Sequence, residues 1–174
     1  MITDLNLKLK AKNIKLVAFD VDGVMTDGSL SYLPDGEEIK TFNAKDGQGI
    51  VMLNKAGFLT AFITASEANA VYERAKTLGV TKLFYKQKNK LQAFKTLLEE
   101  FNLKKEQIAY MGDDYPDLCV IKEAGLTSAP NDAVDDVKKA VSYVSSYGGG
   151  KGAVREFCDF ILYSNGISYE NLVS

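Results

Sequence analysis

The stretch Lys15-Leu-Val-Ala-Phe-Asp20-Val-Asp22-Gly23 decides the fold of this 174-residue chain. Its first part, residues 15–19, is a short apolar run, which predicts a buried strand. The run stops abruptly at Asp20, and Asp22 and Gly23 follow at once. We therefore expect the carboxylates of Asp20 and Asp22 to lie at one end of a sheet.

Strands and helices alternate along the rest of the chain. Apolar runs predict further strands at 58–63, 83–84, 108–111, 125–128 and 141–144. Helical spacing of apolar residues predicts helices at 46–56, 67–78, 89–101, 117–123, 133–140 and 152–163. The Pro34-Asp35-Gly36 turn predicts a β-hairpin at about residues 28–43. This order is typical of an α/β fold, a mostly parallel Rossmann-like sheet with helices on both faces, built as one domain of residues 1–174 without a large cap.

Composition excludes several classes of protein. The net charge of -2 gives no field that would attract nucleic acid. Residues 1–13 are polar, unlike a signal peptide, and no run approaches the roughly 18 apolar residues of a membrane span. Cys119 and Cys158 stand alone in apolar helical contexts, which indicates buried thiols in a reducing compartment. We expect a cytoplasmic protein with neither nucleic-acid nor membrane partners.

The chain contains no histidine. Its absence excludes Ser-His-Asp and Cys-His catalysis and zinc sites of the Cys/His type. Any chemistry must therefore use carboxylates, lysine, hydroxyl groups and a metal ion.

Polar residues follow three of the predicted strands: Asp20 and Asp22, then Thr64, then Gly112, Asp113, Asp114 and Asp117. The carboxyl ends of parallel strands are where ligands bind in such sheets. Carboxylates gathered there would raise one another's pKa values, and a hard cation removes that conflict. Mg²⁺ suits a set of oxygen ligands, whereas the chain has no calcium-binding EF-hand loop.

These residue types suit hydrolysis of a phosphate monoester. Asp20 is the candidate nucleophile, which would form an aspartyl-phosphate intermediate and split one difficult displacement into two. Asp22 lies two residues beyond, placed to protonate the leaving oxygen and later to deprotonate water. Thr64 and Lys90 would bind the remaining phosphoryl oxygens.

Each of these residues also has a plain structural interpretation. Asp-x-Asp-Gly alone can be a surface turn, and Lys90 alone can be a solvated helix residue. Thr64 is expected to cap a helix, with Glu67 completing a capping box. Residues 112–114 can be a turn that caps the next helix. Their occurrence in order, each at a strand end or helix start, favours a site.

The same residues resemble the haloacid dehalogenase superfamily of phosphatases. Its four motifs are matched by Phe-Asp-Val-Asp-Gly-Val-Met-Thr at 19–26, Phe-Ile-Thr at 62–64, Lys90, and Gly-Asp-Asp-Tyr-Pro-Asp at 112–117. The resemblance implies that Asp20, the backbone carbonyl of Asp22, and Asp113 hold Mg²⁺. Asp114 and Asp117 would support the ion, and an aspartate at position 22 indicates a phosphatase or phosphomutase.

Further segments narrow the resemblance: Asp-Gly at 27–28, Lys-Asp-Gly-Gln-Gly-Ile at 45–50, and Gly-Gly-Gly-Lys-Gly-Ala-Val-Arg-Glu at 148–156. They are similar to the family of 3-deoxy-D-manno-octulosonate 8-phosphate phosphatases, which serve lipopolysaccharide precursor synthesis, and to relatives acting on nine-carbon sugar acid 9-phosphates. The family implies a homotetramer whose hairpins meet, burying Leu30, Tyr32 and Ile39. It also implies substrate contacts, for which the candidates are Lys45, Asp46, Gly47, Ser66, Lys86 and Lys88.

One departure concerns the substrate pocket. Thr64-Ala65-Ser66 stands where this family usually has Thr-Gly-Arg. We hypothesise that Lys86 or Lys88 supplies the missing positive charge for a sugar carboxylate. The alternative is that both lysines face solvent.

Two other classes of protein are alternatives to an enzyme: a receiver domain and a non-catalytic assembly subunit. A phosphoacceptor receiver domain also gathers acidic residues, a Thr and a Lys, but it has its acidic pair on the first strand and its acceptor alone on a later one. Here Asp20 and Asp22 flank Val21 after the first strand, and Gly112-Asp113-Asp114 comes late. A non-catalytic assembly subunit would not need these residues intact.

Overall fold

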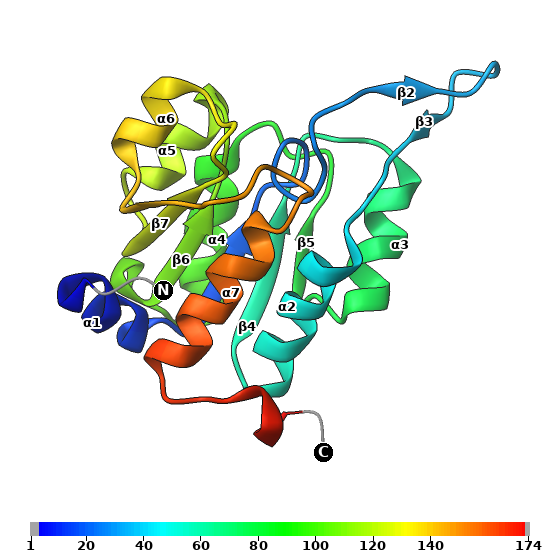
Figure 1. The fold of residues 1–174 in the computed structure, drawn as a ribbon. Coiled ribbons are helices and arrows are strands. Elements are labelled where there is room, and N and C mark those ends of the chain that lie inside the picture. Colours follow the sequence, from blue (N-terminus) through cyan, green and yellow to red (C-terminus); the bar gives the residue numbers. More distant parts are fainter. Residues whose placement is uncertain (1–3, 173–174) are drawn as a thin grey trace.

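The computed structural model describes residues 4–172 and contains a six-stranded parallel sheet (Figure 1). The strands in spatial order are β5 (Lys82–Phe84), β4 (Leu59–Ile63), β1 (Leu16–Phe19), β6 (Ile108–Met111), β7 (Leu126–Ala129) and β8 (Tyr143–Val144). Every neighbouring pair is parallel. The predicted α/β class is confirmed, while the outermost residues of the predicted 1–174 domain lie outside the described residues.

Helices cover both faces of the sheet, which makes three layers. The helices of one face are α1 (Leu5–Asn13), α2 (Ala44–Lys55), α3 (Asn69–Leu78) and α7 (Ala153–Ser164). Those of the other are α4 (Lys90–Glu100), α5 (Leu118–Ile121) and α6 (Asp135–Ala140). Short 3-10 turns occur at η1 (Lys105–Gln107), η2 (Tyr115–Asp117) and η3 (Tyr169–Asn171). The sequence pattern did not predict α1, because its leucines are interleaved with polar residues.

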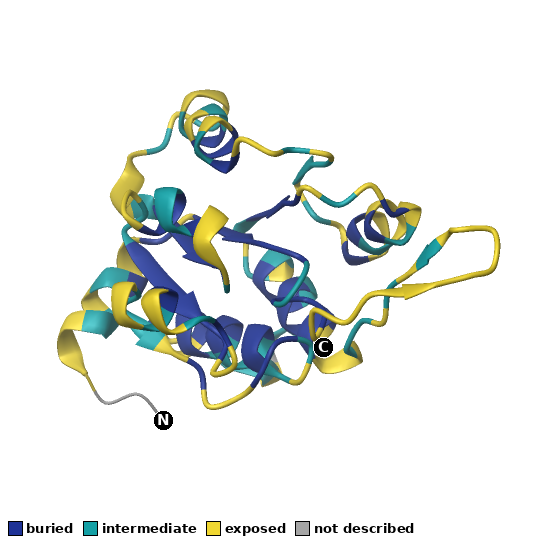
Figure 2. Cartoon of the chain, turned by 90° about the horizontal axis from the view of Figure 1, so that it is seen from above, coloured by how far each residue is buried: buried dark blue, intermediate teal, exposed yellow. Residues whose placement is uncertain are grey.

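The strand β1 is central and buried on both faces. Val17 and Phe19 pack into the core under α2 and α7, whereas Leu16 and Ala18 pack into the core under α4 and α5. Phe19 meets Phe62 of β4 edge to face, with ring centroids 6.4 Å apart. A parallel strand covered on both sides reads as an unbroken apolar run, which is why residues 15–19 predicted it. Figure 2 shows this buried centre beneath exposed helix faces.

The hairpin is smaller than predicted. Its strands, β2 (Ser31–Tyr32) and β3 (Glu38–Ile39), form a separate two-stranded sheet that projects from the body of the protein (Figures 1 and 2). Leu30, Tyr32 and Ile39 are exposed by 63%, 61% and 44%. A lone two-stranded hairpin with exposed apolar side chains is marginally stable by itself.

Two local predictions were wrong. Helix α3 begins at Asn69 with Ala68 as its cap residue, and Thr64 instead accepts a hydrogen bond from the Ser66 amide at 3.0 Å. The capping box fails because Thr64 still pairs with the neighbouring strand, where its amide donates to the Phe84 carbonyl at 3.0 Å, and the helix starts five residues later. Cys158 is buried as predicted, but Cys119 is only half-buried. Between residues 4 and 172, no helix is both long and apolar enough to cross a membrane.

Candidate active site

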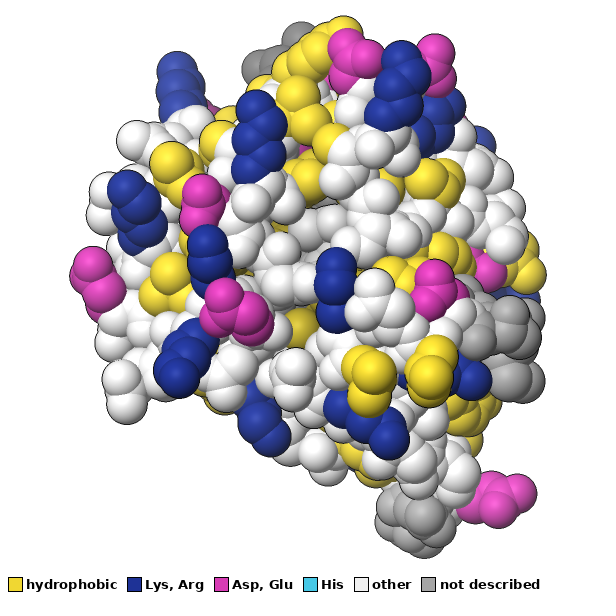
Figure 3. All heavy atoms as spheres, turned by 90° about the vertical axis from the view of Figure 1, so that its left-hand side faces the viewer, with side chains coloured by type: hydrophobic (Ala, Val, Ile, Leu, Met, Phe, Trp, Pro, Cys, Tyr) yellow, Lys and Arg dark blue, Asp and Glu magenta, His cyan; other side chains and the backbone are white. Residues whose placement is uncertain are grey.

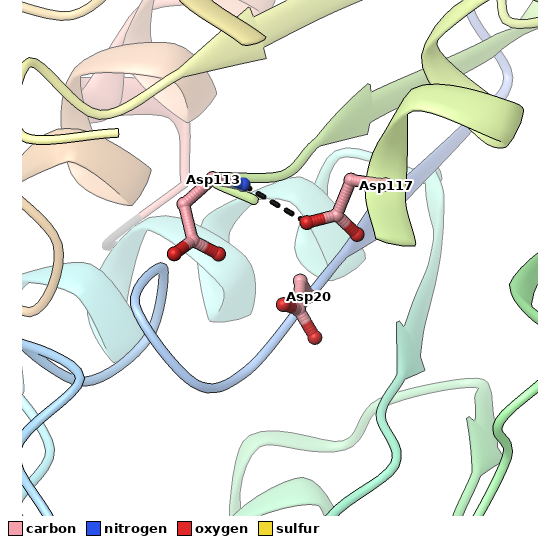
Figure 4. Close-up of side chains that lie close together, drawn as sticks. All are labelled: Asp20, Asp113 and Asp117. Carbon is pink, nitrogen blue, oxygen red and sulfur yellow. Dashed lines mark hydrogen bonds between the residues drawn. The ribbon is translucent and has the colours of Figure 1, made fainter. Parts of the chain in front are cut away.

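Three carboxylates converge at the carboxyl end of the central strands (Figure 4). Asp20 follows β1, while Asp113 and Asp117 come from the loop and turn after the neighbouring strand β6. One oxygen from each side chain lies within 4.8 Å of the others. The parallel register, with Phe19 opposite Met111, places these residues together although they are far apart in sequence.

Asp117 is the best-anchored of the three. It is fully buried, and its Oδ1 accepts hydrogen bonds from Lys90 Nζ and from Tyr110 Oη, both at 2.6 Å. Its Oδ2 accepts from the backbone amides of Asp113 at 3.0 Å and Asp114 at 3.2 Å. Both oxygens are therefore engaged within the protein, which suits a supporting role.

Lys90 contacts both Asp20, the candidate nucleophile, and Asp117. It begins α4, is 6% exposed, and its Nζ lies 2.9 Å from Asp20 Oδ1 as well as 2.6 Å from Asp117 Oδ1. Burial alone would lower the pKa of Lys90, but the carboxylates of Asp20 and Asp117 outweigh burial and raise it. A permanent ammonium group therefore stands beside Asp20.

The single lysine does not neutralise the cluster. Burial, and then the charge of Asp117, raise the pKa of Asp20 well above its ordinary value despite Lys90. The same two causes raise the pKa of Asp113 to about 7. Crowded carboxylates with raised pKa values are typical of functional sites, and a bound cation would stabilise their charged form.

The residues present fit a divalent cation. Asp113 Oδ1 is buried and has no hydrogen-bond partner, so one oxygen in the cluster is free to coordinate. The cluster is made of carboxylate oxygens, the donors that Mg²⁺ prefers. Gly23 lets the first loop approach, because a Cβ there would lie 2.0 Å from Asp113 Oδ2 and the residue has a φ of +85°. The fit supports Asp20 and Asp113 as the metal-binding pair.

Asp22 lies in the turn after β1, with its side chain 38% exposed. Its carboxylate is held by Lys40, which follows β3 of the hairpin and also binds Glu38 at 2.7 Å. Asp114, expected to support the metal, is exposed and uses its side chain to accept from the Tyr115 amide at 2.7 Å as the cap of η2. The structure therefore does not bring the Asp114 side chain into the cluster.

Thr64 is buried at the end of β4, the other neighbour of β1. Among the predicted substrate contacts after it, Ser66 Oγ accepts from the Ala68 amide at 3.2 Å. Lys86 is exposed and pairs with Glu67 at 3.2 Å, and Lys88 is exposed as well. Their roles in substrate binding remain predictions.

The other three predicted substrate contacts lie at the start of α2. Lys45 is exposed, whereas Gly47 is buried where a Cβ would lie 2.1 Å from Arg74 Nη2. Asp46 is fully buried and accepts from the amides of Gly152 at 3.2 Å and Arg155 at 2.8 Å. Both of its oxygens therefore hold the start of α7, a structural task that the sequence pattern did not predict.

A groove of about 850 Å³ lies elsewhere, between α1 and α7. Its lining includes Leu9, Lys45, Tyr147 and Tyr163, and none of the clustered carboxylates. We place the chemistry at the clustered carboxylates, because they lie at the carboxyl ends of the parallel strands and the pKa values of Asp20 and Asp113 are raised.

Sequence reasoning missed two residues of the site. Tyr110 was counted only as an apolar residue of β6, although a buried tyrosine hydroxyl usually needs a polar partner. Lys40 was taken as part of the hairpin, and nothing in its local pattern indicated a partner 18 residues away.

Residues 68–156 match the family model of the haloacid dehalogenase-like hydrolases. Over 157 residues, the chain is 43% identical to 3-deoxy-D-manno-octulosonate 8-phosphate phosphatase of Escherichia coli K12, which covers 90% of this chain and 84% of that protein. The chain belongs to the haloacid dehalogenase-like hydrolases. The predicted family membership is thus confirmed.

Solved haloacid dehalogenase-like structures superpose closely on this chain. A probable YrbI family phosphatase from Pseudomonas syringae has a TM-score of 0.92 at 47% identity, with 94% of this chain and 93% of that chain covered. The 3-deoxy-D-manno-octulosonate 8-phosphate phosphatase of Moraxella catarrhalis, crystallised with magnesium, phosphate and KDO, has a TM-score of 0.91 at 36% identity, with 94% of each chain covered. Both structures therefore share the fold of this chain over most of its length.

The surface of this haloacid dehalogenase-like chain carries mixed charge. Figure 3 shows basic and acidic side chains interspersed on the side where α1, α5 and α6 lie. With a net charge of -2, local geometry rather than a long-range field must hold a phosphate.

Proposed function

We propose that this protein is a magnesium-dependent phosphatase that hydrolyses 3-deoxy-D-manno-octulosonate 8-phosphate to the free sugar acid and phosphate. The observation that carries the proposal is the convergence of Asp20, Asp113 and Asp117 around Lys90 at the strand ends. The choice of substrate is supported by the 43% identity to the Escherichia coli 3-deoxy-D-manno-octulosonate 8-phosphate phosphatase. The enzyme would serve lipopolysaccharide precursor synthesis.

Asp20 is the proposed nucleophile. Its carboxylate oxygen forms a bond to phosphorus as the bond to the sugar oxygen breaks, which gives an aspartyl-phosphate. Asp22 gives its proton to the departing sugar oxygen and then, as a carboxylate, takes a proton from the water that hydrolyses the intermediate. Lys90 holds Asp20 in place and, with Thr64, is proposed to bind the phosphoryl oxygens.

Magnesium when bound supplies positive charge that lets the anionic nucleophile approach an anionic phosphoryl group. Asp20, the Asp22 carbonyl and Asp113 would hold the ion. Asp117 would support it by fixing the amides of Asp113 and Asp114.

Neither rival function is favoured. A nine-carbon sugar acid 9-phosphate would suit the same catalytic residues. The Escherichia coli and Moraxella catarrhalis relatives, however, are named for the eight-carbon substrate, and the name of the Pseudomonas syringae relative gives no substrate. A receiver domain is disfavoured because both Asp20 and Asp22 follow the first strand, with the Gly-Asp-Asp segment late. A comparison of kcat/KM for the two sugar acid phosphates separates the two phosphatase activities.

The decisive test is the Asp20→Asn variant. Its magnesium-dependent hydrolysis of p-nitrophenyl phosphate and of the sugar acid phosphate should fall at least about a thousandfold, because the nucleophile is lost. The matched control is Asp136→Asn, an exposed aspartate of α6, which should keep normal activity. Retention of more than about 0.1 per cent of activity in Asp20→Asn would refute the mechanism.

We further infer a homotetramer in the cytoplasm. The exposed apolar side chains of the hairpin support an assembly that buries them. Free Cys119 and Cys158 suit a reducing compartment. Light scattering of the purified protein tests the first inference, and fractionation of cells tests the second.

A further inference from the structure

Lys40 lies where the hairpin rejoins the body of the protein, and its ammonium group is almost completely enclosed. Its side chain is 2% exposed. Burying an ammonium ion is costly unless it is paired with charged or hydrogen-bonding groups. Its partners are Asp22 and, at 2.7 Å, Glu38. The buried position is tolerated because these two carboxylates share one cation.

The backbone around Asp22 needs no help from Lys40. The amides of Val24, Met25 and Thr26 donate to the Val21 carbonyl at 3.3, 2.8 and 3.1 Å, which closes the turn. The Asp22 side chain differs, because within residues 4–172 Lys40 is its one hydrogen-bond partner. What Lys40 fixes is therefore the orientation of the carboxylate, not the path of the chain.

We propose that Lys40 is a positioning residue for proton transfer: it orients Asp22, and through Asp22 it links the hairpin to the chemical step. The inference rests on the proposed phosphatase function, in which the Asp22 proton moves to the leaving oxygen as the phosphorus–oxygen bond breaks. Without Lys40, Asp22 remains present but samples unproductive rotamers. The loss should then be selective for reactions that need the acid.

Esters with different leaving groups measure this selectivity. Phenyl phosphate releases a phenol with a pKa of about 10, like tyrosine, and needs protonation of the leaving oxygen. p-Nitrophenyl phosphate releases a much weaker base and needs far less help. Neither ester carries a carboxylate, so loss of a contact to a sugar acid cannot produce the effect.

Lys40→Met should lower kcat/KM for phenyl phosphate at least about tenfold more than for p-nitrophenyl phosphate, since a general acid contributes about 10²–10⁴-fold. Asp22→Asn should show the same selective loss. Adding Lys40→Met to Asp22→Asn should bring no further selective loss, because the two residues act as one unit. Lys40→Arg should recover part of the selectivity.

The matched control is Lys82→Met. Lys82 lies on β5 and its ammonium group pairs with the carboxylate of Glu100 at 2.6 Å, so this variant also removes a paired lysine. It should leave the ratio of the two esters unchanged. Should Lys40→Met fail to fold, Lys40→Ala, which also removes the hydrogen-bond donor to Asp22, serves the same comparison.

Equal loss on both esters, or an added selective loss in the Asp22→Asn background, would overturn the positioning role. A wild-type protein without magnesium-dependent hydrolysis of either ester would instead overturn the phosphatase proposal itself. The two failures are therefore distinguishable.

Discussion

At the scale of single residues, the geometry of the acidic cluster depends on how Asp117 is held. Lysine and tyrosine donors on Oδ1 and two amides on Oδ2 fix its carboxylate in one orientation. The amides belong to Asp113 and Asp114, so the same bonds shape the loop that carries Asp113. A buried residue with no direct chemical role thereby sets the position of a proposed metal ligand.

Tyr110→Phe tests this dependence. The variant removes one donor to a buried carboxylate, so the free energy of unfolding should fall by about 1.5–3 kcal/mol. Chemical denaturation measures the change. Tyr115→Phe is the matched control, because that hydroxyl donates to Asp136 at 3.3 Å on an exposed surface, and its loss should cost less than about 0.5 kcal/mol. Equal effects of the two substitutions would contradict the role given to Asp117.

At the scale of elements, the hairpin combines two features with different consequences. Its projecting strands expose apolar side chains, while Lys40 at its base is enclosed and holds Asp22. The outer part suits contact with other subunits, and the base belongs to the site. The hairpin therefore links the surface proposed for assembly to a residue proposed for proton transfer.

Tyr32→Glu tests the outer part. If the proposed homotetramer buries Tyr32, placing a charge there should shift the protein towards monomers, as light scattering would report. The thermal stability of the subunit should change little, since Tyr32 is 61% exposed. Tyr163→Glu is the control, because Tyr163 is 49% exposed near the end of α7, far from the hairpin (Figure 1). An unchanged mass for Tyr32→Glu would exclude assembly through the hairpin.

At the scale of the whole molecule, the cluster couples stability to pH and to magnesium. Burial and the charge of Asp117 raise the pKa of Asp113 to about 7 in the folded protein, against about 3.9 in an unfolded chain. Between these values the folded state binds more protons than the unfolded state. The free energy of unfolding of the magnesium-free protein should therefore fall as pH rises from about 4 to about 7.

Magnesium should oppose this trend, because its ligands must be deprotonated and it binds the folded state. The increase in Tm on adding magnesium should be larger at pH 8 than at pH 5.5. Scanning calorimetry with EDTA or with magnesium measures both effects. Asp113→Asn should flatten the pH dependence and remove most of the magnesium shift. A Tm that rises with pH in EDTA across this window would contradict the assignment.

The sequence by itself determined the sheet, its alternation with helices, and the residues proposed for chemistry, because apolar runs and the acids that end them are local patterns. Asp20, Asp113 and Lys90 were singled out by their places at strand ends and at a helix start. Only the tertiary structure decided that Asp46 holds α7, that Asp114 caps a turn outside the cluster, and that Tyr110 and Lys40 serve Asp117 and Asp22. The physical reason is that these roles are hydrogen bonds made by side chains whose partners depend on how strands, helices and hairpin pack in space.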